Sequence, residues 1–369
     1  MKRFFLFLLF LFPVLSYGQI TTDTYLQQTI QKTLDNIYSY DFAEADLYMK
    51  QLRARYPNHP IGPILQATKL QWQYMPLKDN PVYAGQFTQS CNQALASAQK
   101  MLEKDSDDPE GVFFALTAHS YLALKLYNEG ETMKAVNEAK KAYGYMRQGF
   151  RLMEKNPEFY FTTGLYNYYV ERFPMDHPIV KPVMLFFQDG DTALGLRQMD
   201  VASKRAIFTR IETCFYLSHI YLEHESQFAK AAVYAKQLAE KHPQNALFVI
   251  RYTESLILAG RYDEAAQWLD RLKGLHHKFV PMPVKVLEAM LFEKEERKDA
   301  EAAALYQAAL KMPYYDNYTK EYYAFANAGL ARIAARASDR SKARAFYKKA
   351  LDYAEYKSTI REAKGFIKE

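Results

Sequence analysis

The chain has 369 residues, a formal net charge of +6, and only 14 glycines and 15 prolines. Its length exceeds what one compact core readily accommodates, so we expect several domains or an elongated repeat array. The few glycines and prolines disfavour an all-β or a disordered chain, and the evenly spread charge does not favour nucleic-acid binding, which requires a concentrated basic stripe.

The start of the chain has the composition of a secretory signal peptide. A short basic stretch precedes an apolar run over 4–15, and the small residues Ser16 and Gly18 occupy the positions that a signal peptidase reads. This run is shorter than the about 20 residues that a membrane-spanning helix needs, so an uncleaved anchor is the less favoured alternative. We therefore expect a signal peptide over 1–18 and a mature chain that begins at Gln19.

Export places the mature protein in the periplasm or outside the cell, with peripheral attachment to the outer membrane as a further option. No Cys lies near the cleavage point, which argues against a lipoprotein anchor. No later segment has the length of apolar sequence that a membrane-spanning helix needs, so we expect no transmembrane segment after signal removal. The two cysteines, Cys91 and Cys214, are expected to be small buried thiols, although export would permit a disulfide.

The segment from 19 to 206 predicts helices that repeat less regularly than those after it. Two helix starts are marked by Asp108 and Asn156, each a capping residue followed by a first-turn proline. We interpret this segment as the divergent half of a helical repeat array. Apolar periodicity predicts its helices near 61–75, 83–104, 110–127 and 131–155.

Residues 171–195 interrupt this helical pattern with three prolines and an apolar run. Pro174 is expected to end the helix before it, and Pro178 to begin a new short helix. The run 183–187 is too apolar to be exposed. The segment therefore predicts a buried helical plug that links the two halves of the chain.

The turn QDGD then places Gly190 for a positive φ and Asp191 to cap the next helix. Seven residues of this region stand in a recognisable order: Gly164, Asn167, Pro174, Gly190, Asp191, Gly195 and Leu196. This order resembles the eukaryotic tetratricopeptide-repeat 39 and inclusion-body-clearance protein family, over about residues 110–225. The resemblance implies an all-helical fold and an interaction or adaptor role, with no catalytic residues to carry over.

Residues 246–278 contain the stretch AGRYDEA between two amphipathic helical runs. Gly260 can end the first helix in a left-handed cap because it has no Cβ. Tyr262 is expected to pack between the helices, and Ala265 is small where their backbones approach most closely. Trp268 continues the buried face at helical spacing. This is the tetratricopeptide repeat pattern, with a period of about 34 residues.

The same small residue recurs at the matching position of four other stretches, as Ala45, Ala231, Ala302 and Ala343. Most of these matches tile the later part of the chain with near-regular spacing, so we assign 207–369 to a regular repeat half. We therefore predict an all-α fold, an α-α superhelix (solenoid) of tetratricopeptide-type helix pairs. The half over 19–206, with its 171–195 insertion, is its divergent N-terminal part.

The sequence contains no recognisable motif for catalysis, a cofactor or a metal. His219 and His224 are five residues apart, so they are expected to diverge around a helix, whereas a zinc protease needs a spacing of four. His276 and His277 are adjacent and share no helix face. No Gly-rich phosphate loop, nucleophile elbow or CxxC pair occurs. We therefore predict no enzymatic activity, no cofactor and no metal site.

Five tyrosines gather in the stretch MPYYDNYTKEYYAF, and four of them are our candidate partner-binding residues: Tyr314, Tyr315, Tyr318 and Tyr322. Repeat helices bury many aromatic residues, so most of the 30 tyrosines are expected in the core. The others could line a concave groove. There Tyr suits peptide or glycan binding, because it buries a large area at a low entropic cost.

The leading hypothesis is a non-enzymatic scaffold of the bacterial cell envelope that binds a protein or peptide on a concave face, and not nucleic acid. The alternative is an envelope enzyme or glycan-binding module with a site near residues 171–195. A cleft with convergent Asp176, His177, Asp189 and Asp191 would favour that alternative. The partner and the oligomeric state stay open at this point.

Overall fold

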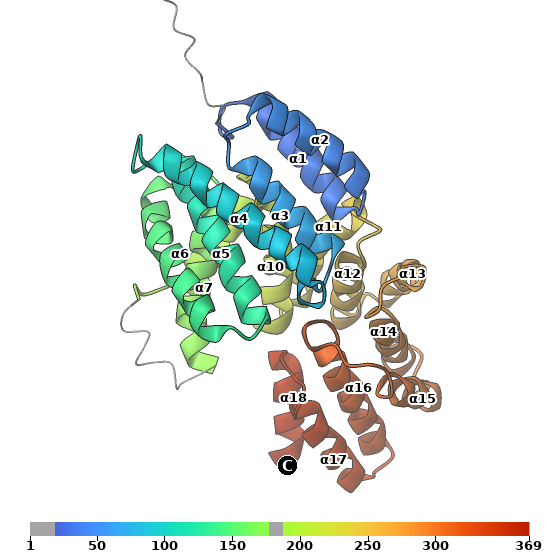
Figure 1. Ribbon diagram of the computed structural model, residues 1–369. Coiled ribbons are helices and arrows are strands. Elements are labelled where there is room, and N and C mark those ends of the chain that lie inside the picture. Colours follow the sequence, from blue (N-terminus) through green and yellow to red (C-terminus); the bar gives the residue numbers. More distant parts are fainter. Residues whose placement is uncertain (1–18, 177–186, 369) are drawn as a thin grey trace, which may run out of the picture. The chain divides into compact units, whose positions relative to one another are not determined.

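The computed structural model describes residues 19–176 and 187–368 (Figure 1). Within these ranges every regular element is a helix and there is no strand. The predicted all-α fold is therefore confirmed. Both cysteines are free and buried, and burial raises the pKa of Cys91 to about 12 and that of Cys214 to about 11.

The chain divides into two compact units, and neither is one continuous stretch. The first contains residues up to 33 and residues 43–148, and the second contains 34–42 and 149–369. This division does not coincide with the predicted boundary at residue 206. The reason is packing: α9 (Thr192–Arg205), which precedes residue 206, packs against α10 (Arg210–Glu223), which follows it. Helix α9 thus belongs to the same unit as the regular repeats, whereas most of the irregular helices before it belong to the first unit.

The first unit is built around the packing of three helices, α3, α4 and α5. Its capping prediction is confirmed at Asp108, whose Oδ1 accepts the N–H groups of Glu110 (3.0 Å) and Gly111 (2.7 Å) at the start of α5. The predicted helices of this region agree with the observed ones within a few residues. The helices that lie wholly or mostly in this unit are α1 (Thr24–Tyr38), α2 (Phe42–Arg55), α3 (Ile61–Gln73), η1 (Leu77–Asp79), α4 (Pro81–Leu102), α5 (Pro109–Asn128) and α6 (Thr132–Leu152).

The second unit is a stack of antiparallel helix pairs. Each pair packs internally, and the first helices of successive pairs also contact one another, from α10 to α12, α14, α16 and finally α18. This is the nearest-neighbour packing of a repeat solenoid. Its helices are α7 (Phe159–Asp176), α9 (Thr192–Arg205), α10 (Arg210–Glu223), α11 (Phe228–Lys241), α12 (Ala246–Leu258), α13 (Tyr262–Lys273), α14 (Pro281–Lys294), α15 (Asp299–Ala309), α16 (Asp316–Arg336), α17 (Arg340–Leu351) and α18 (Lys357–Lys368).

Small residues lie where the paired helices meet. Gly260 has φ of +75°, the left-handed conformation that its place at the helix end requires. Tyr262 is half-buried, and Trp268 is buried on the inner face of α13. The alanines of the repeat signature are all 0% exposed: Ala45, Ala231, Ala265, Ala302 and Ala343.

The prediction that Pro174 ends its helix is wrong. Helix α7 continues through Pro174 to Asp176. The proline has no N–H to donate to the carbonyl of Val170, so α7 lacks one intrahelical hydrogen bond at this position, and it ends two residues later. Pro178 and the predicted plug, apart from Phe187, lie outside the described residues. The structure describes Phe187 as half-buried.

Helices α7 and α9 approach so closely that glycine is required on both. A Cβ on Gly164 would lie 2.9 Å from the carbonyl oxygen of Gly195, and a Cβ on Gly195 would lie 2.6 Å from that of Gly164. Gly190 is also required for space and not for a positive φ, because a Cβ there would lie 2.5 Å from the Asn167 oxygen. Asp191 caps α9 as predicted, with Oδ1 accepting the N–H of Leu194 at 2.8 Å.

The segment 34–42 completes the second unit. The ring of Tyr38 is fully buried and stacks on Phe248 with a centroid distance of 5.8 Å. Its hydroxyl donates to Glu212, and its carbonyl accepts a hydrogen bond from Asn245 Nδ2 at 3.0 Å. Ser39 Oγ lies 2.9 Å from His242 Nδ1. This segment therefore takes part in the core around α10, α11 and α12.

Candidate functional site

A small polar cavity of about 100 Å³ lies on the first helices of the stacked pairs in the second unit. Helices α10, α12 and α16 line it together with the segment just before α18. We call it the α12–α16 cavity. Its lining residues are Phe215, His219, Leu247, Ile250, Arg251, Glu254, Asp316, Asn317, Tyr318, Lys320, Glu321, Tyr322, Glu355 and Tyr356.

Buried charges of α12 form the floor of this cavity. Glu254 is only 2% exposed, and its Oε2 accepts a hydrogen bond of 2.6 Å from the Tyr322 hydroxyl. Its other oxygen, Oε1, is buried with no partner at hydrogen-bond distance. Arg251 donates from Nη1 to the Tyr356 hydroxyl at 2.8 Å, and its guanidinium lies 5.5 Å from the ring centroid of Phe215. The floor of the cavity thus carries one basic side chain, Arg251, and one acidic side chain, Glu254.

Glu321 fixes the wall of the cavity that precedes α18. Its carboxyl group accepts the N–H groups of Glu355 (2.6 Å) and Tyr356 (3.2 Å), and the Thr359 hydroxyl at 2.8 Å. Burial raises the pKa of Glu321 to about 8, and the neighbouring charge of Glu254 acts in the same direction. At neutral pH this carboxyl group therefore holds a proton in most molecules, and it positions Tyr356 without adding a full charge.

The rim of the cavity is polar and aromatic. Lys320 Nζ lies 3.0 Å from Glu355 Oε1, and Asp316 accepts a hydrogen bond of 2.7 Å from the Tyr314 hydroxyl. The ring of Tyr318 is half-buried and stacks on Phe279 with a centroid distance of 4.6 Å. Tyr318 thus contributes an aromatic ring to the lining of the cavity.

The four candidate tyrosines do not form one surface. Tyr318 and Tyr322 line the cavity, and Tyr322 is buried because its hydroxyl holds Glu254. Tyr314 is 45% exposed and packs its ring edge-on against Tyr323. Tyr315 is half-buried, with the Lys278 ammonium 5.5 Å from its ring centroid. Tyr314 and Tyr315 are not among the residues that line the cavity.

The prediction that His219 and His224 diverge is wrong. His219 Nε2 lies 2.6 Å from Glu223 Oε2, and His224 Nε2 lies 3.9 Å from Glu223 Oε1. They converge because α10 ends at Glu223, so that His224 already lies outside the regular helix. Burial alone would raise the pKa of Glu223, but the His219 hydrogen bond and the nearby positive charges lower it overall. In the described part of the chain no group of three or more His, Cys, Asp and Glu side chains could hold a metal ion.

The acidic residues proposed for an alternative site near 171–195 are not brought together in the described residues. Asp191 is used as the cap of α9, and Asp189 is exposed. His177 and the side chain of Asp176 lie outside the described part. The structure thus gives the carboxylate of Asp191 a structural role.

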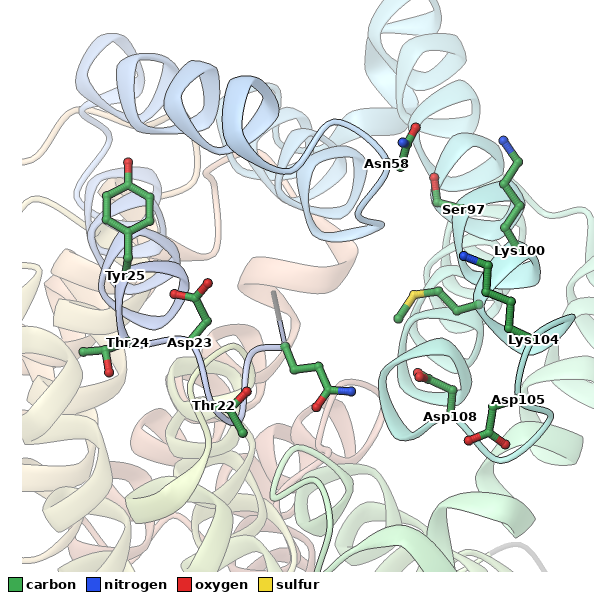
Figure 2. A pocket seen from close by; sticks show the side chains of 12 residues that line it. Thr22, Asp23, Thr24, Tyr25, Asn58, Ser97, Lys100, Lys104, Asp105 and Asp108 are labelled. Atoms are coloured by element: carbon green, nitrogen blue, oxygen red, sulfur yellow. The ribbon is translucent and has the colours of Figure 1, made fainter. Parts of the chain in front are cut away.

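A larger and more open cavity of about 970 Å³ lies in the first unit. Figure 2 shows Lys100 of α4 and Lys104 of the turn after it on the opposite side of the cavity from Tyr25. Asp23 and Asp108 line this cavity, but their carboxylates already accept hydrogen bonds as the caps of α1 and α5. Size alone does not make a recognition site. The α12–α16 cavity is the stronger candidate, because the buried oxygen Glu254 Oε1 has no hydrogen-bond donor there.

No helix in the described ranges is both long and apolar enough to cross a membrane.

Comparison with known proteins identifies one segment. Residues 222–279 match the family model of the tetratricopeptide repeat. The matched segment runs from the end of α10 to Phe279, two residues before α14 begins, so it includes the α12–α13 pair and the Arg251 and Glu254 of the cavity. No curated protein matches the sequence.

Several solved structures of helical-repeat proteins are similar at low identity. The C-terminal part of a TPR repeat-containing protein from Cytophaga hutchinsonii is 14% identical, with 76% of this chain and 98% of that chain covered and a TM-score of 0.38. Yeast Tom70 is 14% identical, with 94% and 83% covered and a TM-score of 0.37. A tetratricopeptide repeat protein from Parabacteroides merdae is 13% identical, with 93% and 98% covered and a TM-score of 0.26.

Proposed function

We propose that this chain is a non-enzymatic scaffold that binds a protein or peptide segment at the α12–α16 cavity. The observation that supports this most strongly is the buried floor of the cavity, where Glu254 Oε1 has no partner at hydrogen-bond distance. A buried polar group without a partner lowers stability. The presence of this unpaired oxygen in a repeat stack is readily explained if a ligand donates a hydrogen bond to it.

The cavity is suited to one side chain or one chain end. At about 100 Å³ it is smaller than the about 300–1,000 Å³ typical of small-molecule sites. It also lies on the first helices of consecutive pairs, which is where an extended segment can contact several repeats at once. We therefore favour a peptide that anchors one residue in the cavity and lies along the neighbouring helices.

We further propose that the protein acts in the cell envelope of a bacterium, because its first residues have the pattern of a signal peptide. The resemblance of residues 110–225 to the tetratricopeptide-repeat 39 and inclusion-body-clearance family supports an adaptor role of the same general kind. An enzyme or glycan-binding module near 171–195 is the less favoured alternative, because Asp191 is used as a helix cap.

Site-specific photo-crosslinking in intact cells tests the scaffold. A photoreactive phenylalanine analogue replaces Tyr318 at the cavity rim, and in a matched control it replaces Val233, which is 58% exposed on α11. We expect a discrete crosslinked protein from position 318 and none from position 233. The same products from both positions, or none from either, would contradict the proposal.

A further inference from the structure

Two buried atoms of residues that line the α12–α16 cavity have no hydrogen-bond partner in the described protein. One is Glu254 Oε1. The other is Nδ1 of His219, whose Nε2 lies 2.6 Å from the Glu223 carboxylate. A carboxylate oxygen accepts hydrogen bonds, so Glu254 Oε1 calls for a ligand that donates one.

The charges around the cavity favour a cation over an anion. Four acidic side chains line it, those of Glu254, Asp316, Glu321 and Glu355, against the two basic side chains of Arg251 and Lys320. Lys320 is paired with Glu355. An anion that approached Arg251 would also approach the unpaired oxygen of Glu254, which would repel it.

The aromatic residues point to the same class of ligand. The rings of Phe215, Tyr318, Tyr322 and Tyr356 line the cavity. A cation near aromatic faces is attracted by their quadrupoles, and the attraction increases when water is excluded. A carboxylate in a cavity lined by aromatic rings therefore suits an ammonium group, which has three hydrogen-bond donors and a compact charge.

We propose that the α12–α16 cavity binds the primary ammonium group of a peptide, carried by a lysine side chain or by the chain's N-terminus. This rests on the proposed function, which it makes more specific. The ammonium donates to Glu254 Oε1, and the methylene groups beside it contact the tyrosine rings. The volume of about 100 Å³ admits an unbranched chain of this kind.

Binding of small capped probes to the mature chain tests the inference directly. The probes are N-acetyl-lysine N-methylamide for the side chain and glycyl-norleucine amide for the N-terminus. N-acetyl-norleucine and N-acetyl-glutamine N-methylamides are the uncharged controls. Binding is measured by ligand-observed NMR and calorimetry. We expect at least one ammonium probe to bind ten-fold or more tightly than both controls, and the probe that does so identifies the source.

Two variants test whether the ammonium probe binds in the α12–α16 cavity. Glu254→Gln should weaken the ammonium probe at least ten-fold, whereas Glu301→Gln, the same chemical change on the exposed face of α15, should leave it unchanged. Because Glu254 is buried, Tyr318→Ala at the rim serves as a second variant and should weaken the probe in a fully folded protein.

Equal binding of lysine, norleucine and glutamine probes, or no binding of either ammonium probe, would overturn the inference. Glutamine binding above lysine would assign the cavity to a neutral amide and also overturn it. The crosslinking result at position 318 is independent of these probes. A protein that still crosslinks a partner there, but binds no ammonium probe, keeps its scaffold function and loses only the ammonium assignment.

Discussion

Glu158 shows how single buried carboxylates hold this protein together. It is 1% exposed and accepts the N–H groups of Ile207 (2.7 Å), Phe208 (2.9 Å) and Thr209 (2.8 Å), as well as the Thr209 hydroxyl at 2.7 Å. These donors precede α10, so they would otherwise be unpaired at a helix start. Glu321 does the same before α18.

We expect Glu158→Ala to lower the free energy of unfolding by about 3 kcal/mol or more, because several buried donors lose their acceptor at once. Glu158→Gln keeps one acceptor oxygen and should lose less. Urea unfolding of the two variants beside the wild type measures this. A loss below about 1 kcal/mol for Glu158→Ala would show that water or local rearrangement replaces the carboxylate.

The raised pKa of Glu321 predicts a pH-dependent stability. Its pKa is about 8 in the folded protein against 4.5 for the free group, so the folded state holds a proton that the unfolded state releases between these values. Raising the pH from about 4.5 to 8 should therefore lower stability. In Glu321→Gln this contribution is absent, and the decrease should be smaller. Thermal unfolding across this range, with Glu301→Gln as the control of unchanged slope, tests it.

At the residue scale the sequence revealed only part of the candidate site. Tyr318 and Tyr322 could be named because aromatic clusters stand out. Arg251 and Glu254 were missed, because charged residues in a helix are usually solvated. A signal was present nevertheless: they stand three apart in the otherwise apolar helix 246–258, so they share one face of a helix that has little solvent face.

At the scale of elements, the α7–α9 pair depends on direct backbone contact. Gly164 and Gly195 face each other, and Asn167 Nδ2 donates to Gln198 Oε1 at 2.8 Å beside them. The sequence singled out both glycines only through a family resemblance. Their physical reason, the absence of room for a Cβ, needed the structure, because helical glycine has no distinguishing local pattern.

We expect Gly195→Ala to destabilise the protein by about 1–3 kcal/mol, because the new methyl group would overlap the backbone of α7. Gly365→Ala is the matched control in α18, where a Cβ meets nothing within 4 Å. That variant should be stabilising by about 0.5–1 kcal/mol through helix propensity. Similar changes in melting temperature for both would contradict the close packing of α7 and α9.

The register of the α12–α13 pair gives a second element-scale prediction. Ala265 is fully buried and Ala266 is half-buried on α13. Ala265→Phe should cost about 1–3 kcal/mol by overpacking, whereas Ala266→Lys should cost less because its long chain can reach water. Thermal unfolding of the two variants, measured side by side, tests this prediction. An equal or greater loss for Ala266→Lys would mean that the helix face is misassigned.

For the whole molecule, the sequence predicted the architecture better than its division. Apolar periodicity and the repeated alanines predicted helix pairs correctly, because these features are local. The grouping of residues 34–42 with 149–369 could not be predicted, because it depends on contacts such as Asn245 with Tyr38 across 207 positions. Neither the apolar periodicity nor the repeated alanines indicate that residues 34–42 pack with the second unit.

The proposed export makes a prediction about the mature protein. If residues 1–18 are a signal peptide, the native protein begins at Gln19. Intact-mass measurement of protein purified from its own cells should therefore show a chain that lacks the first eighteen residues. A chain that retains Met1 would contradict cleavage and would move the proposed scaffold away from the periplasm.

The place of Tyr38 in the second unit has a consequence for the order in which the chain is made. Its partner Asn245 emerges from the ribosome 207 residues later. At about 5–20 residues per second, that interval lasts roughly 10–40 s. The first unit has all of its residues once residue 148 has been made, whereas residues 34–42 must wait for the later helices that they join. The second unit therefore begins at residue 34, before the first unit is finished, and can be completed only after it.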